Sequence, residues 1–232
     1  MTLEEAIAKI KPLDHNAMEI AQKRWDSIAK PLHSLGKLET LLIQIAGITG
    51  NAEVDLSRRG LIAMCADNGV VEEGVTQTGQ EVTAIVAENF LKYDTSVGVM
   101  CKQNHAEIFP VDMGMVTDTK VRTDHKIAYG TQNMTKGPAM TREQAVKGIE
   151  AGIAMVEELK EKGYQILATG EMGIGNTTTS SAVASVLLKQ SVESMTGRGA
   201  GLTSEGLVRK IAAIRKACLL YTSPSPRDST SS

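Results

Sequence analysis

The 232-residue sequence has few aromatic residues, few cysteines and no excess of either charge. Aromatic residues make up 3% of the chain, too few for a platform on which nucleic-acid bases stack. Lys and Arg number 25 and Asp and Glu number 27, a net charge of −2, so neither a nucleic acid nor an anionic membrane is an expected partner. No apolar run approaches the length of a membrane span, and the first residues lack the apolar run of a signal peptide.

The three cysteines, Cys65, Cys101 and Cys218, are odd in number, widely spaced and outside any C-x-x-C pair. This arrangement argues against a disulfide framework and against a zinc site, and it favours a reducing compartment. We therefore expect a cytoplasmic protein without a metal centre. With 42% apolar and 22% charged residues, the composition is that of an ordinary globular protein.

The hydrophobic pattern predicts helices first and then strands that alternate with helices. The first fifty residues carry helical signals, among them a Thr2-x-x-Glu5 capping box and Asp14 as a second cap. Apolar runs at 61–66, 108–111 and 164–169 predict strands, and the run at 61–66 is expected to be buried on both faces. Strands alternating with helices imply an α/β fold with a parallel sheet and right-handed crossovers.

The last eleven residues differ in composition from the rest. Nine of them are Ser, Thr or Pro, which leaves too few apolar groups to pack. The stretch L-L-Y-T-S-P-S-P-R-D looks like translated adapter sequence, in which case the natural chain would be longer; a disordered tail is the alternative. We predict a helical lobe over 1–50, an α/β nucleotide-binding domain over 51–218, and a non-native or disordered tail over 219–232.

The most informative stretch is the turn G-E-M-G-I-G-N-T-T-T-S at 170–180. It lies between a predicted strand and an Ala/Val/Leu-rich helix, an arrangement that offers free N–H groups and a positive dipole end to an anion such as phosphate. Many such turns bind nothing, and this alternative stays open. The turn lacks both the lysine of a P-loop and the order G-x-G-x-x-G of a dinucleotide site. Glu171 would repel phosphate, so it is expected to face a ligand N–H.

Each predicted strand ends in an acid, one further residue and a glycine. The acids are Asp67, Asp112 and Glu171. Ligands of parallel sheets bind at the carboxyl ends of the strands, so the three acids are candidates for one shared crevice. The alternative is that acids and glycines are common wherever a strand becomes a loop.

Several segments, taken together, resemble the family of nicotinate-nucleotide–dimethylbenzimidazole phosphoribosyltransferases. They follow in order along about 2–218, and the turn and the segment at 130–141 are the most specific. The segments are K-P-L-H-S-L-G-K-L-E (30–39), M-C-A-D-N-G-V (64–70), E-G-V-T (73–76), V-D-M-G (111–114), G-T-Q-N-M-T-K-G-P-A-M-T (130–141), G-E-M-G-I-G-N-T-T (170–178) and T-G-R-G-A-G-L (196–202).

The resemblance implies an enzyme that transfers the 5-phosphoribosyl group of nicotinate mononucleotide to 5,6-dimethylbenzimidazole, in the synthesis of the lower ligand of cobalamin. The products are α-ribazole 5′-phosphate and nicotinate. The resemblance also implies a Rossmann-like parallel sheet flanked by helices, a small N-terminal helical lobe, a homodimer, and no organic cofactor. Neither nucleic acid nor membrane is implied as a partner.

The resemblance also assigns roles to residues. Backbone N–H groups near Gly173 and Gly175, with the hydroxyls of Thr177 and Thr178, are suited to the phosphate. Glu171 would touch the benzimidazole, with the capping of strand-end amides as its alternative role. The predicted substrate-binding residues are Thr78, Gly170, Glu171, Met172, Gly173, Gly175, Asn176, Thr177, Thr178 and Lys210.

Two of these assignments have a simpler alternative. Thr78 falls where the family usually has a serine beside the benzimidazole, but a Thr78-x-x-Glu81 pattern also predicts a helix cap. Lys210 matches a family lysine that would contact an anionic group of the substrate, but the simpler interpretation is a lysine on the exposed surface of a helix.

The chain departs from the family pattern in three places. It has Pro31-Leu32-His33-Ser34-Leu35-Gly36 where the family usually reads Pro-Pro-Gly-Ser-Leu-Gly, and Asn68 replaces a frequent histidine. The family's catalytic glutamate lies in a C-terminal segment with no counterpart here, so Glu171 is a candidate substitute base and low activity is expected. A non-catalytic binder of the nucleotide or the benzimidazole is the alternative function.

Overall fold

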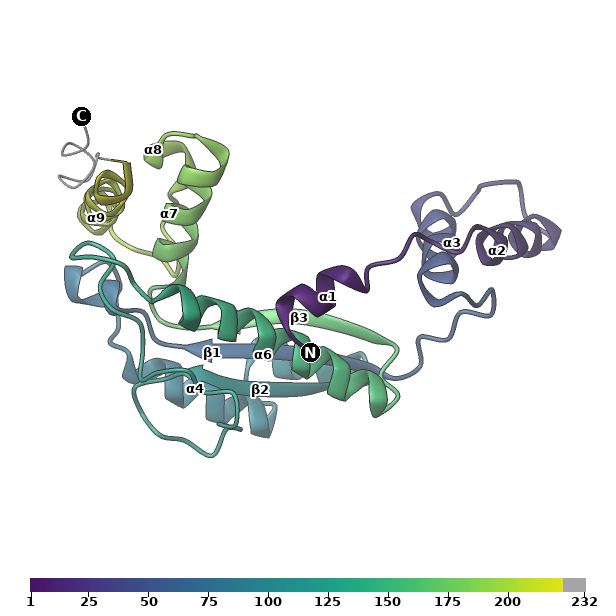
Figure 1. The fold of residues 1–232 in the computed structure, drawn as a ribbon, viewed down its shortest axis with the longest axis horizontal. Coiled ribbons are helices and arrows are strands. Elements are labelled where there is room, and N and C mark those ends of the chain that lie inside the picture. Colours follow the sequence, from purple (N-terminus) through teal and green to yellow (C-terminus); the bar gives the residue numbers. More distant parts are fainter. Residues whose placement is uncertain (223–232) are drawn as a thin grey trace.

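The computed structural model of the chain describes residues 1–222 and is built around a three-stranded parallel sheet (Figure 1). The strands are β1 (Arg59–Ala66), β2 (Ala106–Gly114) and β3 (Ile166–Met172). Their order is β2-β1-β3, so β1 is hydrogen-bonded on both edges. The prediction of an α/β fold with a parallel sheet is confirmed.

Helices precede, connect and follow the strands. The helices within the described residues are α1 (Leu3–Ala8), α2 (His15–Ser27), α3 (Lys37–Thr49), the 3₁₀ helix η1 (Gly69–Glu73), α4 (Glu81–Lys92), α5 (Ser96–Gln103), α6 (Arg142–Glu161), α7 (Asn176–Leu188), α8 (Val192–Met195) and α9 (Ser204–Thr222). None of them is long and apolar enough to cross a membrane.

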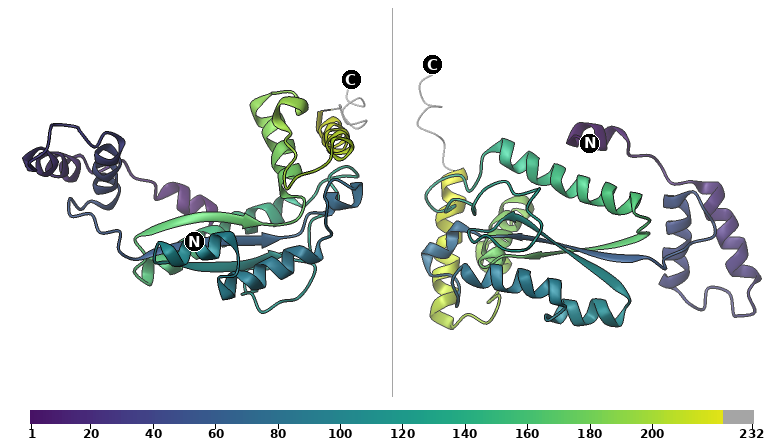
Figure 2. Two further views of the ribbon diagram at one scale, coloured as in Figure 1. Left: turned by 180° about the vertical axis from the view of Figure 1, so that it is seen from behind. Right: turned by 90° about the horizontal axis from the view of Figure 1, so that it is seen from below.

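Both faces of β1 are covered, which accounts for its apolar run, whereas most residues of β3 are exposed. On one face, Ala63 and Cys65 of β1 pack in a cluster with Phe90 of α4 and Cys101 of α5. On the other face, Ile62 of β1 packs in a second cluster with residues of β2 and α6. Successive residues of a strand point to opposite faces, so each needs an apolar partner. Figure 2 shows the two helical layers on either side of the strands.

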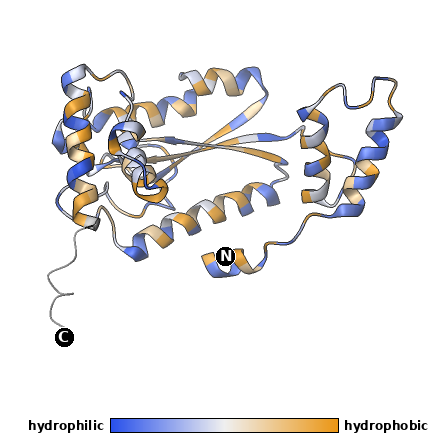
Figure 3. Cartoon of the chain, turned by 90° about the horizontal axis from the view of Figure 1, so that it is seen from above, coloured by the Kyte–Doolittle hydropathy of each residue, from blue (hydrophilic) through white to orange (hydrophobic). Residues whose placement is uncertain are grey.

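A third cluster lies beyond the carboxyl ends of the strands. It joins η1, α7 and α9 through buried residues such as Val70, Ala182 and Ile214. Figure 3 shows hydrophobic and hydrophilic residues alternating along α9, the helix before the C-terminal trace. The cluster holds α9 beside α7, so residues far apart in the sequence meet at this end of the sheet.

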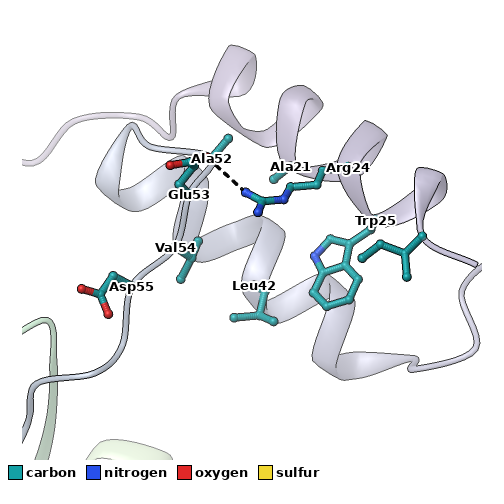
Figure 4. A pocket seen from close by; sticks show the side chains of 9 residues that line it. Ala21, Arg24, Trp25, Leu42, Ala52, Glu53, Val54 and Asp55 are labelled. Carbon is teal, nitrogen blue, oxygen red and sulfur yellow. Dashed lines mark ion pairs between the residues drawn. The ribbon is translucent and has the colours of Figure 1, made fainter.

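The first helices stand at the other end. Helix α1 lies against α6, where the Leu3 amide donates to Glu150 Oε1 at 3.1 Å. Helices α2 and α3 pack against each other, at the end of the molecule opposite α7 and α9 (Figures 1 and 2). A cavity of about 510 Å³ opens between this pair and the segment 52–55, beside Trp25 and an ion pair of Arg24 with Glu53 at 3.5 Å (Figure 4).

Local capping patterns in the sequence correctly predicted where some of the helices begin. The capping boxes at Thr2 and Thr141 form, and Asp14 Oδ1 accepts the Ala17 amide at 2.9 Å. The predicted cap at Thr78 is wrong, because the N-cap of α4 is Gln80, whose side chain makes no capping bond. Helix α9 continues through Thr222, and the rest of the predicted tail lies outside the described residues.

The long loop between β2 and α6 is organised by two buried carboxylates. Asp112 Oδ1 accepts the amides of Gly114 and Met115 at 2.9 and 2.7 Å, and its Oδ2 lies 3.1 Å from Lys126 Nζ. Asp67 Oδ2 accepts the Val116 amide at 2.8 Å. Burial by itself lowers the pKa of Lys126, but its hydrogen bonds to carboxylates raise that pKa above its usual value. Charge pairing therefore fixes the loop to the ends of β1 and β2.

Asp112→Ala is expected to lower the free energy of unfolding by about 3 kcal/mol, because it leaves two buried amides without their acceptor and removes the buried counter-charge of the half-buried Lys126 ammonium. Urea unfolding measures the loss. Asp118→Ala is the matched control: Asp118 Oδ1 lies 3.2 Å from the same Nζ, but its side chain is 77% exposed. The control should cost less than about 1 kcal/mol. Equal losses in the two variants would contradict this account of the loop.

Candidate functional site

The three strands end at the same edge of the sheet. In the register of the ladders, Cys65 of β1 lies opposite both Asp112 of β2 and Met172 of β3. The three acids that begin the acid-x-glycine motifs are thus neighbours at the carboxyl ends of the strands, where parallel sheets bind ligands. The spacing of the motifs correctly predicted this proximity.

The acids differ in exposure and therefore in role. Asp67 and Asp112 are completely buried, and both bind backbone amides of the loop after β2. Burial is the main cause of the raised pKa of Asp67. Glu171 alone is exposed. The hypothesis of a crevice lined by all three acids is therefore wrong in detail: two of them support the edge, and Glu171 faces outward.

The turn after β3 packs directly on the end of β1. A Cβ at Gly173 would lie 2.1 Å from the Ala66 carbonyl oxygen, so only glycine allows this approach. Gly175 precedes α7 with φ +91°, in the left-handed region. The two glycines let the chain reverse tightly from Glu171 into the first residues of α7, beginning with Asn176.

The amides at the start of α7 already have acceptors. The Asn176 amide donates to Gly173 O at 3.0 Å, and the Thr178 amide donates to Gly175 O at 2.9 Å. The Asn176 side chain bridges two further groups: its Oδ1 accepts the Thr177 amide at 2.8 Å, and its Nδ2 donates to Glu171 Oε1 at 3.1 Å. The amides of Asn176, Thr177 and Thr178 are therefore already hydrogen-bonded. An anion must displace Asn176 to reach the Thr177 amide.

Lys210 supplies the positive charge of the site. It projects from α9, its Nζ donates to Thr177 Oγ1 at 2.8 Å and to Gly197 O at 3.1 Å, and the residue is only 1% exposed. Burial lowers the pKa of Lys210. The alternative of an exposed helix lysine is thus excluded. In the described residues no carboxylate forms an ion pair with Lys210, so its charge is available to an anion.

A second glycine-rich loop, 196–202, adjoins this lysine and was missed as part of the site. A Cβ at Gly199 would lie 2.7 Å from Thr177 Oγ1 and 3.4 Å from Lys210 Nζ. The loop backbone therefore packs directly against the Lys210–Thr177 pair. The density of glycines in T-G-R-G-A-G-L is the signal from which its place in the site could have been found.

The remaining predicted residues lie around this centre. Gly170 is an exposed residue of β3, and Met172 packs against the core on the α4 side. Thr178 is 1% exposed, and its hydroxyl has no hydrogen-bond partner among the described side chains and backbone. Thr78 is exposed in the segment before α4; its neighbour Gln77 donates to the Gly201 carbonyl, which brings that segment to the second glycine loop.

A larger cavity lies beside the turn rather than in it. Its volume is about 880 Å³, and it runs along α7 and α9 to Asn68 and the segment 131–140. None of the ten predicted substrate-binding residues lines it. Across residues 1–222, there is also no group of three or more His, Cys, Asp or Glu side chains suited to a metal ion.

The arrangement combines a buried ammonium with a hydroxyl on one side of Asn176 and an exposed carboxylate on the other. The ammonium and hydroxyl suit a phosphate monoester, since charge-assisted hydrogen bonds to phosphate are strong. The carboxylate suits a ligand N–H. The site can thus hold an anionic group and a nitrogen base on the same turn.

Lys210→Met is expected to weaken binding of ribose 5-phosphate at least about tenfold, or ~1.4 kcal/mol, because it removes the only cation in contact with Thr177 among the described residues. Titration calorimetry measures the affinity. Lys216→Met, on the exposed face of the same helix, is the matched control and should leave the affinity unchanged.

The same ligand provides a pH test. A lysine carries its charge below its pKa, so affinity should fall as the pH rises through the lowered pKa of Lys210, before the usual value of about 10.4 is reached. Above about pH 7.5 the phosphate keeps its full charge, so the ligand does not contribute to the fall. Lys210→Met should abolish this pH dependence; a profile that Lys210→Met leaves unchanged would contradict the assignment.

Relatives of known name share most of this chain. It is 50% identical over 230 residues to nicotinate-nucleotide–dimethylbenzimidazole phosphoribosyltransferase of Ruminiclostridium cellulolyticum, covering 98% of this chain and 65% of that protein. It is 46% identical over 217 residues to the protein of the same name from Clostridium tetani, covering 93% of this chain and 60% of that protein. The chain thus spans less than two thirds of the length of these relatives.

Solved structures agree with this similarity. The crystal structure of CobT from Thermus thermophilus superposes with a TM-score of 0.81 at 34% identity, covering 91% of this chain and 63% of that one. A second crystal structure from the same organism, named as the nicotinate-nucleotide–dimethylbenzimidazole phosphoribosyltransferase, gives a TM-score of 0.80 at 33% identity and covers 92% of this chain and 63% of that one.

A family model described as "Phosphoribosyltransferase" matches residues 10–231. That match includes the glycine turn, the second glycine loop and Lys210, the three parts that meet at the carboxyl end of the sheet. The chain therefore belongs to the phosphoribosyltransferase family that contains the nicotinate-nucleotide–dimethylbenzimidazole enzymes.

Proposed function

We propose that this chain transfers the 5-phosphoribosyl group of nicotinate mononucleotide to 5,6-dimethylbenzimidazole, giving α-ribazole 5′-phosphate and nicotinate. The observation that carries the proposal is the placement of Lys210 and Glu171 on either side of one turn. Lys210 Nζ contacts Thr177, and Glu171 is linked through Asn176 to the amide of the same Thr177. Relatives with 50% and 46% identity carry the name of this activity.

The nucleotide phosphate binds between α7 and the second glycine loop. Lys210 contributes the charge and Thr177 a hydroxyl, and the backbone of the loop at Gly197 and Gly199 packs directly against this pair. Asn176 Oδ1 holds the Thr177 amide as a phosphate oxygen would, so the nucleotide takes over this bond when Asn176 moves aside. The phosphate needs no metal clamp, because a monophosphate carries no pyrophosphate.

The acceptor base binds against Glu171. The Glu171 carboxylate accepts one hydrogen bond, from Asn176 Nδ2, at a site where the N–H of a benzimidazole would donate. A carboxylate has about four lone-pair sites, so further donors fit. Thr78 and Met172 remain proposed contacts of this base, and Gly170 allows a flat ring to approach the strand.

The reaction requires one bond exchange and one proton transfer. The unprotonated benzimidazole nitrogen attacks C1′ of the ribose as the bond from C1′ to the nicotinate nitrogen breaks, and that electron pair neutralises the pyridinium. The product is then a benzimidazolium that loses its N–H proton to a carboxylate. Glu171 is the acceptor available in this chain. The phosphate, held by Lys210, keeps C1′ in place for the attack.

We propose a homodimer in the cytoplasm. Apolar side chains of the α2–α3 pair are exposed, among them Leu38 at 51%, Leu41 at 55% and Ile48 at 65%, which favours an interface there. A monomer at all concentrations in sedimentation equilibrium would refute the dimer. Cys65 and Cys101 are buried thiols outside any disulfide, as suits a reducing compartment.

The activity is tested with a chimera that joins this chain to the remaining third of the Ruminiclostridium cellulolyticum relative. The chimera should form α-ribazole 5′-phosphate from nicotinate mononucleotide and dimethylbenzimidazole, as measured by chromatography of the products. The chain alone should be slower, because Glu171 is then the only proposed base. A folded chimera that binds both substrates without product would favour the non-catalytic binder instead.

Glu171→Gln is expected to weaken dimethylbenzimidazole binding about tenfold and nicotinate mononucleotide binding by less than about twofold, since the amide keeps the shape of the side chain but loses the charge that attracts an N–H. Titration calorimetry with each ligand separates the effects. Glu161→Gln, at the end of α6, is the control for a lost surface charge. A larger loss for the nucleotide than for the base would remove Glu171 from the benzimidazole site.

A further inference from the structure

Both backbone polar groups of Ile174, the residue between the two glycines of the turn, are held by side chains from other elements. Thr83 Oγ1 accepts the Ile174 amide at 3.0 Å. Asn68 Nδ2 donates to the Ile174 carbonyl oxygen at 3.1 Å. These partners lie 91 and 106 residues away in sequence. We refer to Asn68 and Thr83 as the Ile174 clamp.

Thr83 is placed by α4 and is completely buried. Its hydroxyl has a single hydrogen, and its oxygen already accepts the Ile174 amide, so that hydrogen points to another acceptor. Asp67 is the neighbouring carboxyl: burial raises its pKa, and the nearby Thr83 hydroxyl opposes that rise. Asp67 is itself fixed by the Val116 amide at 2.8 Å. The Thr83 hydroxyl therefore lies between the Ile174 amide and a carboxyl that is fixed to the loop after β2.

Asn68 follows β1 and is equally constrained. Besides donating to Ile174, its Oδ1 accepts from Thr179 Oγ1 at 3.3 Å, and its backbone carbonyl accepts from Gln80 Nε2 at 3.1 Å. Its side chain thus joins the middle of the turn to the first turn of α7. A hydrogen-bond acceptor alone at this position would serve Thr179 but would not hold the Ile174 carbonyl.

We propose that the Ile174 clamp positions the turn for substrate: Asn68 and Thr83 hold the Ile174 peptide groups so that Glu171 and Thr177 stand at the distance that the nucleotide and the base require. This inference rests on the proposed function. Neither residue reacts; both act through the backbone of the turn.

The need for such a clamp follows from the glycines. Gly173 and Gly175 flank Ile174 and give the backbone wide conformational freedom. The Ile174 side chain is half-buried, so packing restrains it only in part. The two hydrogen bonds of the Ile174 peptide groups are then a direct restraint on the segment between the Glu171 carboxylate and the Thr177 hydroxyl. A shift of about 1 Å there is enough to weaken a site that depends on positioning.

The experiment uses two substitutions of Thr83 with opposite chemistry. Thr83→Val keeps the shape and removes the hydroxyl, whereas Thr83→Ser keeps the hydroxyl and removes the methyl group. If the clamp acts as proposed, Thr83→Val should speed hydrogen exchange of the Ile174 amide at least about tenfold. It should also weaken binding of nicotinate mononucleotide at least about fivefold. Thr83→Ser should restore both. Exchange is followed by NMR of the 232-residue chain, and binding by calorimetry.

Thr135→Val is the matched control, since Thr135 is also buried and its hydroxyl donates to Glu73 at 2.8 Å, away from the turn. It should change neither readout. If Thr83→Val does not fold, Asn68→Ala takes its place with the same expected losses. The opposite order, with Thr83→Ser impaired and Thr83→Val normal, would reveal a packing role and overturn the proposal. Faster exchange at Ile174 with unchanged nucleotide affinity would overturn it as well.

Failure of the proposed function would look different. In that case the parent chain would not bind nicotinate mononucleotide, and Lys210→Met would change nothing. Exchange at Ile174 in Thr83→Val and Thr83→Ser would still decide whether the clamp holds the turn. An unchanged exchange rate in both variants would then overturn the clamp independently of any substrate.

Discussion

The parallel pairing of β1 with both neighbours, together with the burial of both its faces, is the constraint on which the rest of the structure depends. Parallel strands require crossover connections, and those connections place helices over both faces of the sheet. All three strands then end at one edge. The turn after β3 is pressed against the end of β1, where the Ala66 carbonyl leaves room only for a glycine at position 173. The site is a product of this close approach.

Buried charge is used in two ways at that edge. Asp112 and Lys126 are paired, so the cost of removing each from water is offset by the other and by backbone amides. Lys210 is buried with a hydroxyl and a carbonyl as its partners, and burial lowers its pKa. A paired ion serves stability. An ion buried without a counter-charge is costly, and the proposed phosphate site would supply that counter-charge.

The features that were predicted correctly depend on short stretches of sequence. The caps at Thr2 and Thr141 involve residues three positions apart, and the strands show as apolar runs. The predicted helix cap at Thr78 does not form, although its sequence pattern matches a capping box as well as those at Thr2 and Thr141 do. The chain around it is held by long-range contacts, Gln77 with the second glycine loop and Gln80 with Asn68, and these override the local preference.

Sequence alone determined the fold class, the glycine turn and the family resemblance. All three depend on local features of the chain: the spacing of apolar residues, the spacing of glycines and the order of the motifs. It also put three acids at one edge of the sheet. Only the tertiary structure decided what each acid does, since burial separates Asp67 and Asp112 from the exposed Glu171. The same holds for Lys210 and for the Ile174 clamp. Their partners are distant in sequence, and no local pattern encodes a contact that forms only when β1, α4, α7 and α9 pack together.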